Sequence, residues 1–127
     1  MRYVAEHPVE EEGDNKETIA GLKALRIQFH LNLALVALRA ENYSDAIKSA
    51  SHALELDLSK TDQAKAYYRR GQAYGKMKDD KAAIEDLKRA AELTPEDTGV
   101  QHELEAARRR VRERREKERK AYAKMFS

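Results

Sequence analysis

Apolar residues recur every three or four positions along most of this 127-residue chain, which is the spacing of one face of an α-helix. Short polar segments around Glu41, Ser59, Asp79 and Thr94 interrupt the pattern. The chain has only five glycines and two prolines, and this composition favours helices over sheets. We therefore predict an all-α fold. The five expected helices cover about residues 16–40, 43–56, 61–78, 81–93 and 95–124.

Two segments that lie 37 residues apart have the same pattern. Residues 42–56 (NYSDAIKSASHALEL) align with residues 79–93 (DDKAAIEDLKRAAEL), and upstream of them Ala34 aligns with Gly71. Each unit is a helix, a short polar turn and a second helix. Small residues at matching positions would let the paired helices approach closely. The sequence therefore predicts two copies of a helical hairpin.

The segment TPED at residues 94–97 has the features of a helix start. Thr94 can cap the helix, Pro95 suits its first position, and the two acids suit its first turn. The apolar residues that follow are spaced to pack on the second hairpin, and they are Val100, Leu104, Ala107 and Val111. Beyond Val111 the pattern stops, so we expect the segment RERREKERK to project into solvent.

The first long helix has two apolar sides. We expect one of them to face the second helix of its own hairpin, and its members are His30, Leu33, Ala34 and Ala37. The other side carries Leu22, Phe29 and Val36, which recur every seven residues. If that side is exposed, it makes a sticky patch. We then expect self-association through it, or exchange of the first helix between two copies with the segment SKTDQ as hinge.

Composition gives no sign of an enzyme, a metal site or a cofactor. The chain has no cysteine, and its four histidines are scattered without metal-ligand spacing. It contains no glycine-rich phosphate loop and no nucleophile motif. The longest apolar run, LNLALVAL, is too short to span a bilayer. The absence of cysteine is typical of a reducing compartment, and we expect a cytoplasmic protein.

Charge is distributed unevenly along the chain. Residues 1–18 hold six acids and two bases, whereas residues 98–127 hold ten bases and five acids. The basic last helix could bind calmodulin, RNA or an acidic membrane, which is our alternative interpretation. A helix of mixed sign is more often simply solvated. Large apolar anchors are sparse, and no aromatic residue lies between Arg108 and Lys120, so we expect neither specific nucleic-acid binding nor membrane binding.

The hairpin pattern resembles the tetratricopeptide repeat, which places small residues and a late proline at fixed positions. The second unit matches well, through Tyr67, Gly71, Tyr74, Ala83, Ala90 and Pro95. The first unit is looser, and it matches through His30, Leu33, Ala34, Ala46 and Ala53, with Leu58 where proline is common. The resemblance implies one α-solenoid domain with a long C-terminal capping helix. Its expected parts are residues 1–15 (an acidic loop and the remnant of a first repeat), 16–60, 61–94 and 95–127.

Lys65 and Arg69 are one helical turn apart and therefore point the same way. In the stacked arrangement that the resemblance implies, both would lie on one wall of the domain, and Asn32 holds the position of Arg69 in the preceding unit. An ammonium, a guanidinium and an amide are all hydrogen-bond donors. Their natural guest is an extended peptide rich in carboxylates, including its own C-terminal carboxylate.

This set is similar to the dicarboxylate clamp of co-chaperone tetratricopeptide domains. Those domains hold the acidic tail, ending Glu-Glu-Val-Asp, of heat-shock protein 90 or heat-shock protein 70. The family's clamp lysine, arginine and asparagine match Lys65, Arg69 and Asn32. The resemblance implies that further residues line the groove, namely Gln28, Leu31, Leu35, Tyr68 and Gln72.

Other segments resemble large immunophilins of the cyclophilin 40 type, among them KAYYRRGQAYGKM, DLKRAAELTPED and KAYAKMFS. In that family a peptidyl-prolyl isomerase domain precedes three repeats and a basic tail. The opening MRYVAEH resembles the end of the family's first repeat. We therefore expect this chain to be the C-terminal part of a longer protein, without the isomerase domain. It would also lack the helix that carries the family's other clamp lysine and asparagine.

Overall fold

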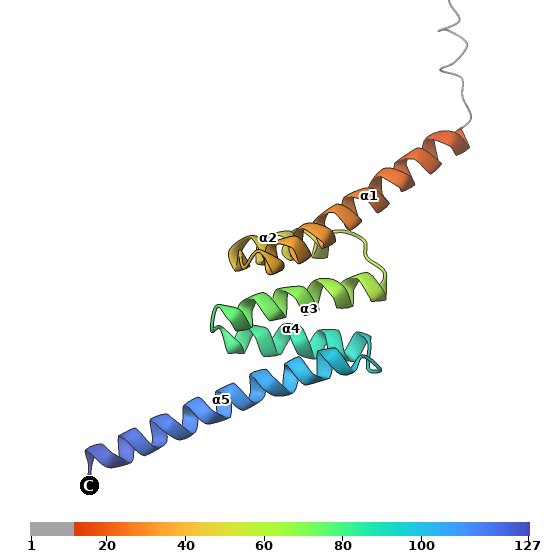
Figure 1. The fold of residues 1–127 in the computed structure, drawn as a ribbon. Coiled ribbons are helices and arrows are strands. Elements are labelled where there is room, and N and C mark those ends of the chain that lie inside the picture. Colours follow the sequence, from red (N-terminus) through yellow and green to blue (C-terminus); the bar gives the residue numbers. More distant parts are fainter. Residues whose placement is uncertain (1–11) are drawn as a thin grey trace, which may run out of the picture.

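The computed structural model describes residues 12–127, with side chains from Asn15 onward, and these residues form five helices joined by short turns (Figure 1). The helices are α1 (Glu12–Arg39), α2 (Tyr43–Leu54), α3 (Lys60–Lys76), α4 (Asp80–Leu93) and α5 (Thr98–Met125). This part of the chain contains no strand, so the all-α prediction is confirmed. The acidic loop expected at residues 1–15 lies mostly outside the described residues, and α1 begins already at Glu12. In residues 12–127 no helix is long and apolar enough to cross a membrane.

The helices form two hairpins and a cap. Each helix packs on the next one, and α3 also contacts α1 and α5 (Figure 1). Alanines fill most of the buried positions, as the small-residue pattern predicts. The fully buried ones are Ala34, Ala46, Ala50, Ala53, Ala66, Ala73, Ala83, Ala90 and Ala107. The arrangement confirms two stacked helical hairpins, α1–α2 and α3–α4, with α5 covering the second.

Both hairpins close through the same turn. Glu41 follows α1 and Lys78 follows α3, and both adopt left-handed backbone with φ of 60° and 67°. The next residues, Asn42 and Asp79, donate their N–H groups to carbonyls of the preceding helix and cap the following one. These two turns lie 37 residues apart, so the repeat spacing read from the sequence is also present in the backbone.

The expected start of the last helix at Pro95 is wrong. Thr94 instead ends α4, and its hydroxyl donates to the carbonyl oxygen of Ala90 at 2.9 Å. Asp97 caps α5, because its carboxylate accepts two backbone N–H groups of the first turn. A residue before proline is disfavoured in helical conformation, which explains why α4 stops at Thr94. The segment TPED is therefore a short connection.

The rotation of α1 differs in part from the expectation. Ala34 and Ala37 are buried as predicted, and the ring of His30 stacks on His52 of α2. Leu33, however, is 42% exposed, whereas Leu31 is only 1% exposed and belongs to the core beside Ala53, Leu58 and Ala66. The segment LNLALVAL is apolar on every side, so its sequence pattern does not fix which leucine faces inward.

The C-terminal half of α5 leaves the body of the protein (Figure 1). Val100, Leu104 and Ala107 are buried, Val111 is half-buried, and residues 112–127 are exposed, as predicted. Charged contacts extend the α4–α5 interface beyond Val111. The buried carboxylate of Asp80 accepts hydrogen bonds from Arg110 and Arg114. Burial acts to raise the pKa of Asp80, but the hydrogen bonds from Arg114 and Arg110 outweigh it and the pKa is lowered, so this carboxylate stays ionised.

A second buried acid connects three helices. Both oxygens of the Asp86 carboxylate accept hydrogen bonds from Arg70 of α3, at 2.7 and 2.9 Å. The same guanidinium donates to the hydroxyl of Ser51 on α2 at 3.1 Å and lies over the ring of Tyr67. The hydrogen bond to Asp86 raises the pKa of Arg70. Sequence reasoning did not single out this pair.

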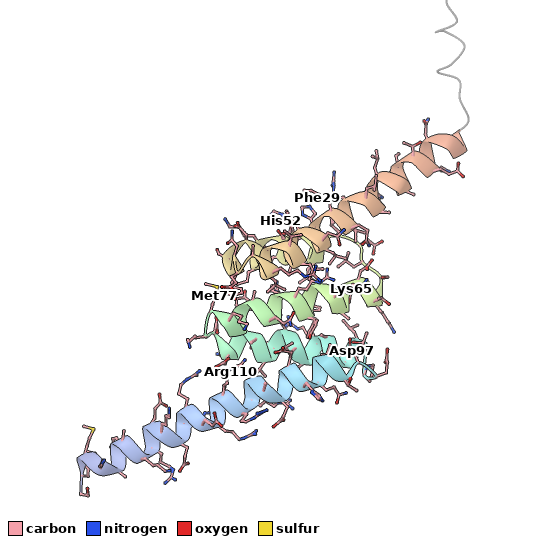
Figure 2. The ribbon with its side chains drawn as sticks, viewed as in Figure 1. Phe29, His52, Lys65, Met77, Asp97 and Arg110 are labelled. Carbon is pink, nitrogen blue, oxygen red and sulfur yellow. The ribbon has the colours of Figure 1, made fainter. Side chains whose placement is uncertain are left out.

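The second apolar side of α1, for which we expect self-association, is exposed. Leu22, Phe29 and Val36 are each about 60% exposed, and Ile19, Leu25 and Leu33 extend the stripe. Phe29 is drawn on the outer side of the stack (Figure 2). The connection between α2 and α3 is anchored, because Leu58 is buried and Leu56 packs on the same core cluster. This anchoring favours docking of intact copies over exchange of α1.

We therefore predict reversible self-association through α1. Burying one such leucine, phenylalanine or valine side chain contributes about 1.5–3 kcal/mol. Light scattering after size exclusion should give a mass above that of the monomer at high micromolar concentration, and Leu22→Gln combined with Phe29→Gln should restore the monomer. A clean monomer that binds no hydrophobic dye would show that the stripe is not sticky.

Candidate peptide-binding site

Matching rows of side chains run along one face of α1 and one face of α3. Positions i, i+4, i+7 and i+11 fall on one helical face. The row on α1 is Gln28, Asn32, Leu35 and Arg39, and the row on α3, 37 residues later, is Lys65, Arg69, Gln72 and Lys76. A third row on α5, 34 residues further, is Glu103, Ala106 and Arg110. We call these three rows the inner wall.

Arg69 joins the first two rows. It is half-buried, and its Nη1 donates to the carbonyl oxygen of Leu31 at 2.8 Å. This bond holds the guanidinium against the backbone of α1, one residue before Asn32. Burial lowers the pKa of Arg69, and the charge of Arg39 lowers it further, while Asp62 opposes them. The like charge that Arg69 faces is therefore on α1.

Most of the predicted groove residues are accessible. Gln28, Asn32 and Lys65 are exposed, and Leu35 and Gln72 are half-buried. Lys65 lies in the N-terminal part of α3, at the opposite end from Met77 (Figure 2). The prediction that Leu31 lines the groove fails, because its side chain is buried in the core. Its backbone carbonyl, which positions Arg69, takes part in the site instead.

Tyr68 extends the wall toward α5. It is half-buried and packs on the core cluster that contains Leu87 and Leu104. Burial raises the pKa of its phenol, and the carboxylates of Glu103 and Asp97 raise it further. Tyr68 is therefore a neutral hydrogen-bonding group at the junction of α3 and α5.

Two cations of the wall were not predicted. Arg39 ends the row on α1, and Lys76 ends the row on α3. The groove assigned from the sequence stopped at Leu35 and Gln72, one turn before them. Extending each row by one more helical turn, with the same spacing of 37 residues between the rows, would have found Arg39 and Lys76.

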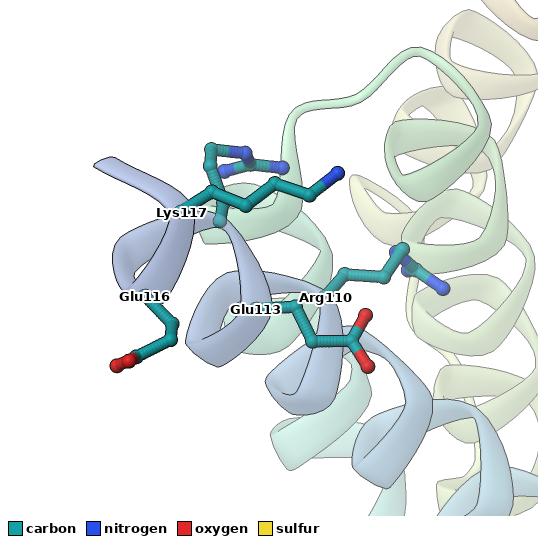
Figure 3. Close-up of a pocket in the computed structure, with 5 residues that line it drawn as sticks. Arg110, Glu113, Glu116 and Lys117 are labelled. Atoms are coloured by element: carbon teal, nitrogen blue, oxygen red, sulfur yellow. The ribbon is translucent and has the colours of Figure 1, made fainter. Parts of the chain in front are cut away.

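Another hollow lies beside the second half of α5. It measures about 480 Å³ and is lined by Arg110, Glu113, Arg114, Glu116 and Lys117 (Figure 3). These side chains all come from one helix and have mixed charge, so the hollow selects no particular ligand. Within residues 12–127, no group of three or more acids and histidines is placed to hold a metal ion.

The comparison with protein families agrees with this geometry. Residues 64–97 match the model of the tetratricopeptide repeat, and they cover α3, α4 and the turn before α5. The chain is a tetratricopeptide-repeat domain. Its C-terminal helix α5 then occupies the capping position of such a solenoid.

Similar proteins carry this domain as part of a longer chain. The domain is 43% identical to "Peptidyl-prolyl cis-trans isomerase D" of Cryptococcus neoformans, and the match covers 99% of this chain and 35% of that protein. It is 38% identical to "Peptidyl-prolyl cis-trans isomerase CYP7" of Saccharomyces cerevisiae, with 100% of this chain and 32% of that protein covered. The chain thus spans about a third of the length of these relatives. Residues 12–127 contain the helical repeats and no cyclophilin domain.

A solved structure has the same arrangement of helices. The C-terminal tetratricopeptide domain of a Plasmodium falciparum protein, described as FK506-binding, superposes with a TM-score of 0.71 at 29% identity. The match covers 84% of this chain and 68% of that one. The domain is therefore similar to the repeat domains of immunophilins, which is consistent with a role in protein–protein interaction.

Proposed function

We propose that this domain binds the acidic C-terminal tail of heat-shock protein 90 or heat-shock protein 70 through a dicarboxylate clamp. The observation that carries the proposal is the position of Arg69, which bridges from α3 to the backbone carbonyl of α1 one residue before Asn32. Lys65 lies one turn before Arg69 on the same row and is exposed. The facing rows of α1 and α3 therefore supply an amide, a guanidinium and an ammonium for this proposed clamp.

These three groups suit a peptide that ends in two neighbouring carboxylates. A guanidinium can hold a carboxylate with two hydrogen bonds, and an ammonium holds it as a point charge. The guanidinium has five N–H donors, of which the bond to the carbonyl of Leu31 uses one. That bond holds Arg69 in place before the ligand arrives, so less side-chain entropy is lost on binding.

The relatives suggest what the clamp would serve. They are peptidyl-prolyl isomerases, and the sequence resembles large immunophilins of the cyclophilin 40 type. In a parent protein of that type, the domain would bring an isomerase to the chaperone in the cytoplasm. The catalytic step would belong to the parent, because residues 12–127 form only the repeats and their cap.

We predict that Lys65→Ala and Arg69→Ala each weaken the binding of a Glu-Glu-Val-Asp peptide by roughly tenfold to a hundredfold. A hydrogen bond to a charged group contributes about 1.5–3 kcal/mol, which corresponds to that range. Isothermal titration calorimetry measures the affinity directly. Lys88→Ala, on the exposed side of α4, is the matched control and should bind like the unaltered chain. Unchanged affinity in both wall variants would rule out the clamp.

A second candidate function rests on the exposed half of α5. Residues 112–127 follow the apolar stripe of α5 and are all exposed. Tyr122, Met125 and Phe126 are exposed apolar side chains near the end of this helix. Calmodulin binds basic amphipathic helices with apolar anchors of this kind. Calmodulin, single-stranded RNA and the acidic peptide should be titrated side by side. Removal of residues 116–127 should abolish calmodulin binding and leave peptide binding unchanged.

A further inference from the structure

A cavity of about 440 Å³ lies between α3 and α5, at the far end of the inner wall from Lys65. Its lining is Gly71, Gln72, Gly75, Lys76, Lys78, Leu87, Glu103, Ala106 and Arg110. A Cβ atom added to Gly75 would lie only 3.0 Å from Nη2 of Arg110. The absence of a side chain at Gly75 therefore lets the guanidinium of Arg110 reach across to α3.

The cavity is predominantly basic. Lys76 and Lys78 are exposed at its rim, and Arg110 reaches in from α5. Glu103 is the only acid of the lining. The Nε of Arg110 donates to Asp80, but Arg114 shares that carboxylate, so the cluster of these three residues keeps one positive charge. The cavity therefore favours acidic side chains and peptide carbonyl groups.

Helix ends alone do not explain these cations. Lys76 lies in the last turn of α3, where a positive charge compensates the helix dipole. Arg110 lies in the middle of α5, far from either end, and Lys78 lies in the turn after α3. Arg110 also has a structural partner in Asp80, and what it shares with the two lysines is a position around this cavity.

The cavity adjoins the row of side chains that contains the clamp residues. Gln72 belongs both to the cavity lining and to the row that begins at Lys65. From Lys65 to Lys76 the row spans eleven residues of helix, or about 16 Å. An extended peptide advances about 3.3 Å per residue, so about five residues cover that distance. A four-residue ligand held at Lys65 and Arg69 ends before Lys76, and a nine-residue ligand reaches past Lys76 into the cavity.

We propose that the inner wall binds a longer acidic segment than the clamp alone requires. The C-terminal carboxylate lies at Asn32, Lys65 and Arg69, the chain then follows α3 past Gln72, and upstream acidic side chains enter the cavity lined by Lys76, Lys78 and Arg110. This inference rests on the proposed clamp. It assigns a new subsite to that ligand and implies selection of tails with glutamate or aspartate about five or more residues before the end.

Three peptides test the subsite by calorimetry with the full chain. The first is Glu-Glu-Val-Asp, the second adds five glutamates before it, and the third adds five glutamines instead. An exposed ion pair changes affinity by a factor of about 1.5 to 5, so several together should make the glutamate peptide about five- to tenfold tighter than the other two. Lys76→Gln combined with Lys78→Gln should remove this gain and leave the four-residue peptide unaffected. Lys88→Gln is the matched control.

The outcomes separate the two proposals. If the four-residue peptide binds but the glutamate and glutamine extensions bind equally well, the subsite is wrong and the clamp stands. Equal weakening of all three peptides by the double variant would also contradict the subsite, because the effect would then act on the clamp end. If none of the peptides binds, both proposals fail together.

Discussion

Ending the chain at Asp97, without α5, is expected to abolish the cooperative thermal transition of the protein. Helix α5 contributes the buried residues Val100, Leu104 and Ala107, which cover the second hairpin around Leu87. A solenoid needs such a cap because its terminal hairpin cannot bury its own apolar face. The truncation would also leave the carboxylate of Asp80 without its two arginines. Circular dichroism on heating measures the result.

A shorter truncation is the matched control. A chain that ends at Arg115 keeps the apolar stripe and both arginines that bind Asp80, and it removes only exposed residues. Its thermal midpoint should stay within about 3 °C of the full chain, which is less than 1 kcal/mol for a domain of this size. If the chain without α5 melts like the full chain, the capping role of α5 is wrong.

Asp86→Ala is expected to lower the free energy of unfolding by about 3 kcal/mol. The Asp86 carboxylate is buried, and its loss would leave the guanidinium of Arg70 unpaired between three helices. Breaking a buried pair costs about 3–5 kcal/mol, and the lower end applies because Arg70 keeps some access to water. This is a large share of the stability of a small domain. Urea unfolding followed by circular dichroism gives the value.

Glu85→Ala provides the comparison for that measurement. Glu85 is the preceding residue of α4 and is exposed, so its replacement should change stability by less than about 0.5 kcal/mol. Equal urea midpoints for the two variants would mean that the Arg70–Asp86 pair does not stabilise the stack of α2, α3 and α4.

The helices could be predicted well from the sequence because several independent features indicated the same elements. Helical periodicity, small residues at the repeat positions and polar turns at Glu41 and Lys78 all indicated the same hairpins. The pattern was ambiguous in two places. In TPED both Thr94 and Asp97 are good caps, and only the packed structure selects Asp97. In LNLALVAL apolar residues lie on all sides, so the choice of Leu31 over Leu33 depends on contacts with α2 and α3.

The candidate site was predictable in part. Asn32, Lys65 and Arg69 could be assigned to one wall, because the repeat spacing places them in register. The bond from Arg69 to the carbonyl of Leu31 could not be predicted, since it depends on how closely α1 and α3 approach. The ion pairs of Asp80 and Asp86 join residues 16 to 34 positions apart, and no local pattern marks such partners.

The most direct test of the clamp compares two forms of one peptide. A Glu-Glu-Val-Asp peptide with a free C-terminal carboxylate and the same peptide with a C-terminal amide should be titrated into the unaltered chain by calorimetry. The clamp predicts that the amide binds at least about tenfold more weakly, because one charge-assisted hydrogen-bond acceptor is lost. Equal affinity of the two forms would contradict a dicarboxylate clamp at Asn32, Lys65 and Arg69.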